Sequence, residues 1–389
     1  MTELTLLWLL LPVAALSGWY LGRRNERQSD ESGPAAELRS DYYRGINYLL
    51  NDQPDQAIEV FIKLLEVDAD TAETHLALGN LYRRRGEVDR ATRIHQNLIA
   101  RAGLSEDQHN EALLELAQDY LSAGLLDRAE DLFNELSPGK RYKVQALRQL
   151  IDIYEQEKDW QKAIEAATEL ERATGNQLGA VVAHYLCELA MVDKHNGERD
   201  GALSRVREAL TRHRASVRAS LLEGELLAER GDHLRAIASY QRVEDQDPGY
   251  LPEALRRMAD SFKTLGTSTA LRDYLERVMQ RHGTTTATLA LADMVHKDKG
   301  AAAAAEFLSG QLEGRVSVRG IDKLLELESG LSDTSQEPPP PSHSAALLKG
   351  LTEKLLEQRP VYQCEHCGFP AKSLHWKCPS CKHWNTVKP

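Results

Sequence analysis

The sequence is poor in the residues that define several structural classes. Its 389 residues include only 14 prolines and 25 glycines, which excludes collagen-like and fibrous proteins. Lysine and arginine total 48 against 59 acidic residues, and the resulting net charge of −11 disfavours a general nucleic-acid coat protein. Because 42% of the residues are hydrophobic, the chain is too apolar for wholesale disorder, and its length suffices for two or three domains.

Cysteine is almost absent until the last 26 residues. Of the five cysteines, Cys187 stands alone, and the others form two C-x-x-C pairs separated by ten residues: Cys364, Cys367, Cys378 and Cys381. A secreted disulfide scaffold would spread its cysteines along a short chain, whereas paired C-x-x-C motifs place four sulfurs around a tetrahedral metal ion. Since four ligands leave no open position, we predict one structural Zn²⁺. Iron in a rubredoxin-like electron-transfer site and two separate thiol–disulfide motifs are the alternatives.

The segment that carries these cysteines is a small domain, predicted over residues 343–389. Residues 343–358 have the periodicity of a short amphipathic helix, and the metal module follows. Its core is expected to consist of a few aromatic residues: Tyr362, Phe369, Trp376 and Trp384. So small a module needs the metal for its folding energy. An exposed tryptophan could stack on a base, but packing against neighbouring helices is favoured, and nucleic-acid binding is unlikely with so small a positive charge.

The N-terminus is predicted to be a transmembrane signal anchor, residues 1–22. Leu4–Gly22 contains no charged side chain, and 19 residues span ~28 Å as a helix, close to a bilayer core of ~30 Å. Arg23, Arg24 and Arg27 follow it, which places the bulk of the chain in the cytoplasm. A cleaved signal peptide and a buried soluble helix are the alternatives. Residues 23–37 form a polar linker.

The middle of the chain, residues 38–310, repeats with a period of 34. Four positions illustrate it: Gly45, Tyr48, Ala57 and Phe61 recur as Gly79, Tyr82, Ala91 and His95. Further copies follow, a weak eighth among them, so about seven to eight tetratricopeptide-like repeats are expected. The predicted fold class is all-α, a tetratricopeptide-repeat superhelix with an N-terminal transmembrane helix and a small C-terminal rubredoxin-like zinc ribbon. Residues 311–342 form a divergent helix and a Pro-rich linker.

Stacked helix pairs make a concave face that usually binds protein segments. By analogy with other repeats of this kind, the first helix of each pair lines the groove. Six residues are partner-binding candidates on this basis: Asn80, Arg83, Arg84, Gln118, Arg148 and Asp152.

Catalytic motifs are missing from the sequence. It has no G-x-x-x-x-G-K-[ST], no H-E-x-x-H and no G-x-S-x-G. Cys187 is expected to be a buried apolar residue without a histidine in position to activate it. We therefore predict that the protein is not an enzyme.

The order of anchor, repeats and four-cysteine ribbon resembles the lipopolysaccharide assembly protein B family of Gram-negative bacteria. The residues that carry the resemblance are Leu4–Gly22 with Arg23-Arg24, the repeats from Tyr42 onward, and Cys364-x-x-Cys367 with Cys378-Pro-x-Cys381. The resemblance implies an adaptor at the inner membrane, with its bulk on the cytoplasmic side. It further implies three kinds of partner: the protease FtsH, the deacetylase of the lipid A pathway, and lipopolysaccharide export or regulatory membrane proteins. In this family the ribbon packs on the repeats.

Other functions fit parts of the pattern. A general tetratricopeptide co-chaperone or assembly scaffold at the membrane would bind many clients rather than one. An iron–sulfur electron-transfer protein and a nucleic-acid-binding ribbon are rivals from other classes.

Overall fold

The structure is a computed structural model of the chain, and it describes residues 34–67, 71–139, 141–332, 343–358 and 360–389. The chain divides into two units, Met1–Gln156 and Glu157–Pro389. The predicted transmembrane anchor, residues 1–22, lies outside the described residues. Among the helices that are described, none has both the length and the apolar character needed to cross a membrane.

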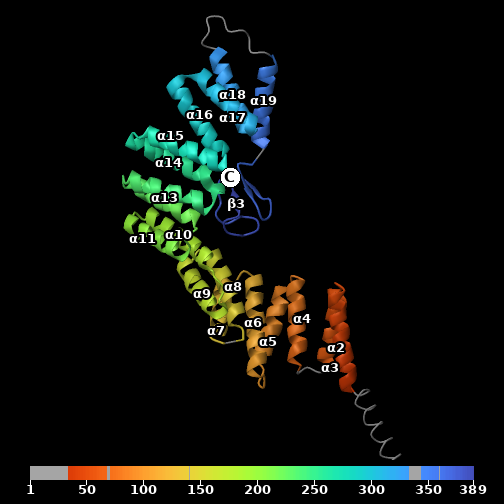
Figure 1. The fold of residues 1–389 in the computed structure, drawn as a ribbon. Coiled ribbons are helices and arrows are strands. Elements are labelled where there is room, and N and C mark those ends of the chain that lie inside the picture. The colour runs from red at the N-terminus through yellow and green to blue at the C-terminus, as the bar shows by residue number, and fades with distance from the viewer. Residues whose placement is uncertain (1–33, 68–70, 140, 333–342, 359) are drawn as a thin grey trace, which may run out of the picture. The chain divides into compact units, whose positions relative to one another are not determined.

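The first unit is built from helices that pair with their neighbours in sequence (Figure 1). Its helices are α2 (Pro34–Leu50), α3 (Pro54–Val67), α4 (Ala72–Arg84), α5 (Val88–Ile99), α6 (Glu106–Ser122), α7 (Leu126–Leu136) and α8 (Lys143–Glu157), the last of which ends at the unit boundary. Local signals fix the helix starts. At α6, for example, Ser105 accepts a hydrogen bond from the Gln108 N–H, and the Gln108 side chain bonds back to Ser105, which forms a capping box.

The second unit continues the pattern and ends in a small sheet. Its helices are α9 (Trp160–Thr174), α10 (Gly179–His195), α11 (Arg199–Arg212), α12 (Val217–Glu229), α13 (His233–Gln246), the 3₁₀ turn η1 (Pro248–Tyr250), α14 (Leu251–Leu265), α15 (Ser268–His282), α16 (Thr285–Lys299), α17 (Ala301–Gly314), α18 (Val318–Ser332) and α19 (His343–Gln358). The pair α16–α17 covers the weak eighth repeat, and α18 packs on α17, so the helical stack extends beyond residue 310.

Glycine on the first helix of a pair makes room for a ring on the second helix. A Cβ atom added at Gly79 would lie 2.3 Å from Nε2 of His95, and one added at Gly224 would lie 2.3 Å from Cε1 of Tyr240. Real Cβ contacts are never that short, so the ring occupies the space that any side chain would need. The small residues of the 34-residue pattern therefore allow the two helices of a pair to approach closely.

We expect Gly224→Ala to lower the free energy of unfolding by about 1–3 kcal/mol, because the added methyl group forces the buried Tyr240 ring to move. Gly310→Ala is the matched control. Gly310 lies inside α17 with open space around its Cα, so alanine there should stabilise the helix by about 0.5–1 kcal/mol. Thermal unfolding followed by circular dichroism measures both changes, and equal midpoints for the two variants would contradict the steric argument.

The turns between paired helices use left-handed backbone. At four of these turns the residue is a glycine with φ between 74° and 85°: Gly86, Gly124, Gly197 and Gly231. Lys158 takes the equivalent place with φ of 60°, although it is not glycine. Glycine is favoured at these positions because it reaches positive φ without steric cost.

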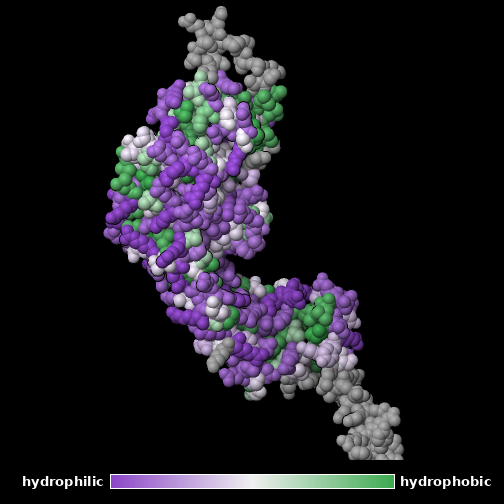
Figure 2. Space-filling view, in the orientation of Figure 1, coloured by the Kyte–Doolittle hydropathy of each residue, from purple (hydrophilic) through white to green (hydrophobic). Residues whose placement is uncertain are grey.

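The last part of the second unit is a three-stranded antiparallel sheet of order β2-β1-β3, with β1 (Tyr362–Cys364), β2 (Pro370–Ala371) and β3 (Val387–Lys388). Tyr362 pairs with Ala371, and Gln363 pairs with Lys388. The preceding helix α19 exposes one apolar side, which Figure 2 shows as a green patch over that helix. Its exposed residues are Leu347, Leu348, Leu351 and Leu355.

Candidate metal centre and its contact surface on the repeats

The four ribbon cysteines converge on one point. Cys364 and Cys367 come from β1 and the turn after it, and Cys378 and Cys381 come from the second knuckle. Their ligand atoms all lie within 4.8 Å of one another. The sulfurs of Cys364 and Cys381 are 3.8 Å apart, and those of Cys367 and Cys378 are 3.7 Å apart. Four sulfurs at ~2.3 Å from a central ion have tetrahedral edges of ~3.8 Å, so the arrangement fits a bound metal ion.

Hydrogen bonds favour the thiolate form of Cys364. Burial opposes ionisation of Cys364, but its hydrogen bonds with the Thr386 hydroxyl and with the N–H groups of Cys367 and His366 outweigh burial and lower the pKa of the thiol to about 6. The Thr386 oxygen lies 3.3 Å from that sulfur. The turn after β1 therefore presents backbone N–H groups to the sulfur of Cys364. At Cys381 a hydrogen bond from the His383 N–H lowers the pKa of the thiol, but burial and the three neighbouring thiols outweigh it and raise the pKa to about 12.

Histidines lie near the centre without completing it. His366 and His383 stack with ring centroids 3.9 Å apart, and Nδ1 of His383 lies 2.8 Å from the Cys381 carbonyl oxygen. With Cys381 they form a second group whose possible ligand atoms lie within 4.8 Å of one another. This group shares Cys381 with the four cysteines, which by themselves supply a complete tetrahedral ligand set.

The ribbon core differs from the one that the sequence predicts. It contains Tyr362, Cys364, Ala371, Cys378 and Val387, with Phe369 packed against it. Trp376 and Trp384 were expected in this core, and that prediction is wrong. Strands of two and three residues leave no room inside for an indole ring, so both tryptophans point outward, and they contact the helices of the same unit.

An aromatic cluster joins the ribbon to the helices. Trp384 stacks on His184 of α10 at 4.7 Å and meets Tyr185 and Trp160 edge to face at 5.9 and 6.5 Å. Trp376 stacks on Tyr250 at 5.3 Å. The favoured role for exposed ribbon tryptophans, packing against the repeats, is the one that the structure shows. Aromatic pairs of this kind contribute about 0.5–1.5 kcal/mol each beyond the buried area.

Polar contacts fix the orientation of the ribbon (Figure 1, dark blue beside the green helices). The buried Tyr362 hydroxyl donates to Glu253 of α14 at 2.6 Å, and the Tyr250 hydroxyl donates to the Val387 carbonyl at 3.1 Å. Lys388 pairs with Asp247 at 3.1 Å. Burial raises the pKa of Glu253, but hydrogen bonds from Tyr362 and Arg257 outweigh it, and the net pKa lies below the usual value.

His184 is buried between charged and aromatic neighbours. Burial is the main cause that lowers its pKa from 6.5 to about 3, and the charges of Arg218 and His213 act in the same direction. The ring is therefore neutral at pH 7 when the ribbon is docked.

Acid is expected to weaken the contact between ribbon and helices through this ring. The pKa of His184 is lower in the folded protein than in the unfolded chain, so the unfolded chain takes up a proton first as the pH falls. The contribution of His184 to the free energy of unfolding is therefore complete above pH 6.5 and is lost progressively toward pH 3. At pH 5 the loss is about 2 kcal/mol. His184→Phe keeps a ring against Trp384 and should flatten this dependence, whereas exposed His195→Phe should not. Thermal unfolding midpoints of the parent and both variants at pH 7.5 and pH 5 measure this pH dependence. Since all three proteins keep the four cysteines, acid effects on the metal cancel, and equal slopes in all three would refute the argument.

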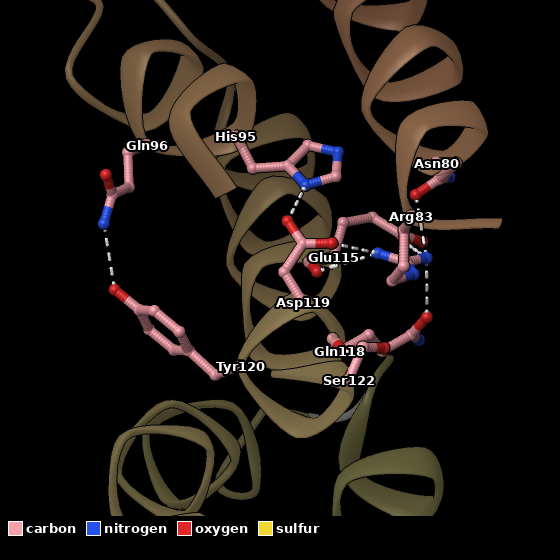
Figure 3. Close-up of polar contacts among 9 residues, drawn as sticks. All are labelled: Asn80, Arg83, His95, Gln96, Glu115, Gln118, Asp119, Tyr120 and Ser122. Carbon is pink, nitrogen blue, oxygen red and sulfur yellow. Dashed lines mark hydrogen bonds and ion pairs between the residues drawn. The ribbon is translucent and has the colours of Figure 1, made fainter. Parts of the chain in front are cut away.

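The structure brings three of the six groove candidates together (Figure 3). Arg83 of α4 donates to the side chains of Asn80 and Gln118, and to the carboxylates of Glu115 and Asp119. Burial would lower the pKa of Arg83, but these two carboxylates raise it above its usual value. The guanidinium is only 14% exposed and its donors are engaged, so it joins α4 to α6, the first helices of consecutive repeats.

The network reaches into the core. Asp119 of α6 is fully buried, and its second oxygen accepts a hydrogen bond from Nδ1 of His95 at 2.6 Å (Figure 3). Nε2 of His95 is buried and has no hydrogen-bond partner among the described residues. The other three candidates, Arg84, Arg148 and Asp152, are exposed on α4 and α8 and are not part of this network.

Cys187 is buried on α10, as the sequence predicts. Its exposed fraction is 0%, and burial is the main cause that raises the pKa of its thiol to about 12. A neutral thiol enclosed by helices serves packing. The functional residues that sequence reasoning missed are those that receive the ribbon: Trp160, His184, Tyr185, Asp247, Tyr250 and Glu253.

Paired helices that carry a docked four-cysteine ribbon define a tetratricopeptide-repeat protein with a rubredoxin-like metal domain. Residues 362–389 match the family described as rubredoxin metal binding domain, and residues 74–108 and 187–250 match tetratricopeptide repeat families. The chain is 36% identical to lipopolysaccharide assembly protein B of Escherichia coli strain K12, covering 99% of this chain and 98% of that one. It is 32% identical to the protein of the same name from Haemophilus influenzae, with the same coverage. The chain therefore belongs to the lipopolysaccharide assembly protein B family, and the resemblance found in the sequence is confirmed.

Proposed function

We propose that this protein is a non-enzymatic adaptor of the inner membrane that regulates lipopolysaccharide synthesis. In this role it presents the deacetylase of the lipid A pathway to the protease FtsH. The repeats face the cytoplasm and hold the deacetylase, and residues 1–22 keep the adaptor in the bilayer that also holds the protease. Confinement of both proteins to one membrane raises their effective concentration without any new contact.

The observation that carries this proposal is similarity along the whole chain. The match to the Escherichia coli protein includes 386 residues, so it extends over the N-terminal apolar segment, the repeats and the ribbon together. The geometry agrees with a binding role. The metal centre has four sulfur ligands and therefore no open position for a substrate, and its ribbon is held against α10 and α14.

We propose zinc as the metal. Four thiolates hold Zn²⁺ or iron equally well, but a zinc centre is redox-silent and suits a ribbon whose role is structural. Metal analysis of the purified full chain with a visible absorption spectrum tests this. One zinc per chain and a colourless protein are expected, and an iron-thiolate spectrum would favour the electron-transfer alternative.

Deletion of residues 1–22 tests the adaptor role. The shortened protein should leave the membrane fraction, and the deacetylase should become longer-lived in cells. A matched control replaces residues 1–22 with an unrelated anchor of the same orientation, which should restore membrane attachment. Unchanged deacetylase turnover after the deletion would contradict the proposal.

Cross-linking in intact membranes identifies the partners directly. Recovery of the protease and the deacetylase is the expected result. Recovery of a broad set of unrelated clients, without enrichment of these two, would instead support the general co-chaperone.

A further inference from the structure

A cavity lies at the C-terminal part of the helical stack, and none of its lining residues belongs to the ribbon. It has a volume of about 300 Å³ and is bordered by the end of α15, the start of α16, the end of α17 and the start of α18. This volume is at the lower end of the range for ligand sites. It suits a group of the size of one amino acid.

One end of the cavity is positively charged. Arg315 is the only charged side chain in its lining among the described residues. Its Nη1 donates to the carbonyl oxygens of His282 and Gly283, at 3.0 and 2.7 Å. These two bonds hold the guanidinium in place before any ligand arrives. A Cβ atom at Gly283 would lie 1.6 Å from Nη1, so the glycine also makes room for the arginine.

The free edge of this guanidinium is suited to a carboxylate. Within the described ranges, no acidic side chain pairs with Arg315, and its Nε and Nη2 donors have no hydrogen-bond partner. That edge presents two parallel N–H groups, the geometry that a carboxylate accepts in a bidentate manner. The hydroxyl of Thr285, on the first residue of α16, adds a neutral donor to the same lining.

One wall of the cavity is apolar. Met279, Leu289, Leu308 and Leu312 form it, and the remaining side chains of the lining are neutral polar groups, among them Gln280, Thr288 and Gln311. A single positive charge beside an apolar wall favours a singly charged carboxylate that carries an aliphatic group over a doubly charged phosphate. We propose that this cavity binds such a carboxylate, either as a free acid or as the C-terminal residue of a protein chain.

Paired ligands that differ only in charge test the proposal on the full chain. N-acetyl-leucine is expected to bind, and N-acetyl-leucinamide should bind at least about tenfold more weakly because it cannot form the charged bidentate pair. Saturation-transfer NMR of the ligand methyl groups measures both dissociation constants. Equal affinities for acid and amide, or no saturable binding of the acid, would overturn the proposal.

Variants locate the site. Arg315→Gln should weaken binding of the acid by about tenfold, and Thr285→Val should weaken it by a smaller factor. Arg319→Gln removes an exposed charge four residues away and is the matched control, with an expected change of less than about twofold. If Arg315→Gln disturbs the end of α15, as circular dichroism would show, Thr285→Val and the amide ligand still decide. An equal loss in Arg319→Gln would show mere attraction to surface charge and refute the site.

A peptide arm distinguishes the two sources of the carboxylate. A short peptide that ends in leucine should bind more tightly than N-acetyl-leucine if the natural ligand is a chain terminus, and equally well if it is a free acid. In either case, amidation of the peptide's C-terminus should weaken its binding at least about tenfold, because it removes the charged bidentate pair. The adaptor proposal has its own test. Deacetylase turnover can be measured in a strain that carries Arg315→Gln, separately from binding of the carboxylate, so either proposal can fail without the other.

Discussion

Removal of the metal is expected to unfold residues 362–389 and to detach Trp376 and Trp384 from the helices. The buried part of the ribbon consists of five residues, and strands of two or three residues cannot hold together on that core alone. Structural zinc sites in small domains supply about 10–16 kcal/mol of apparent folding energy at neutral pH, which exceeds every other contribution available to this segment. The aromatic contacts with α10 and η1 depend on the ribbon geometry and should disappear with it.

Tryptophan fluorescence measures this release. The chain has five tryptophans, and three of them, Trp160, Trp376 and Trp384, belong to the contact surface. Chelation should shift their emission to longer wavelength, whereas far-ultraviolet circular dichroism should change little because the helices remain. Cys378→Ser should give the same spectrum without chelator. Cys187→Ala is the matched control, since it removes a buried cysteine that is not a ligand and should keep the metal. Unchanged emission from a protein shown to be metal-free would disprove the prediction.

The sequence predicts those parts of the fold that depend on patterns within short segments of the chain. The ligand set depends on two C-x-x-C motifs within 18 residues, and the helix pairs follow from small and aromatic residues at a fixed period of 34. The range of α19 likewise follows from its own periodicity. Each of these signals lies inside a single element or between neighbours in the chain.

The contact surface for the ribbon could not be predicted in the same way. Tyr362 and Glu253 are 109 residues apart, and Tyr250 and Val387 are 137 apart. No period relates them, and each residue in isolation fits an ordinary helix or strand. The prediction therefore placed the two tryptophans in the ribbon core, because the residues that they contact in the structure are distant in sequence.

The buried network of the first unit did leave a signal in the sequence. His95 occupies the repeat position that holds Phe61 and Phe133, and Asp119 directly precedes Tyr120, where other repeats have Leu81 and Ile153. Two polar residues thus replace apolar ones in consecutive repeats. Burial of either polar residue without a partner would cost free energy, so the occurrence of both at core positions of consecutive repeats predicts that they pair.

Asp119→Ala is expected to destabilise the first unit by about 3–5 kcal/mol, because it breaks a buried ion pair from one side. Arg83 would keep Glu115 as its only carboxylate partner, and the His95 Nδ1–H would lose its acceptor inside the core. Exposed Asp131→Ala on α7 is the control and should stay within about 0.5 kcal/mol of the parent. Urea unfolding of the full chain, with hydrogen exchange of residues 72–122 as a local measure, follows both variants.

A paired substitution separates the loss of a specific bond from general damage. His95→Phe with Asp119→Leu restores the apolar pattern of neighbouring repeats, and Gly79 provides for a ring at position 95 as Gly45 does for Phe61. Replacement of both polar partners by apolar side chains leaves neither group unsatisfied, and Arg83 retains Glu115. The double variant should therefore be more stable than Asp119→Ala. If it is less stable, the network contributes net stability by itself, and the argument that Asp119→Ala costs mainly through an orphaned partner is wrong.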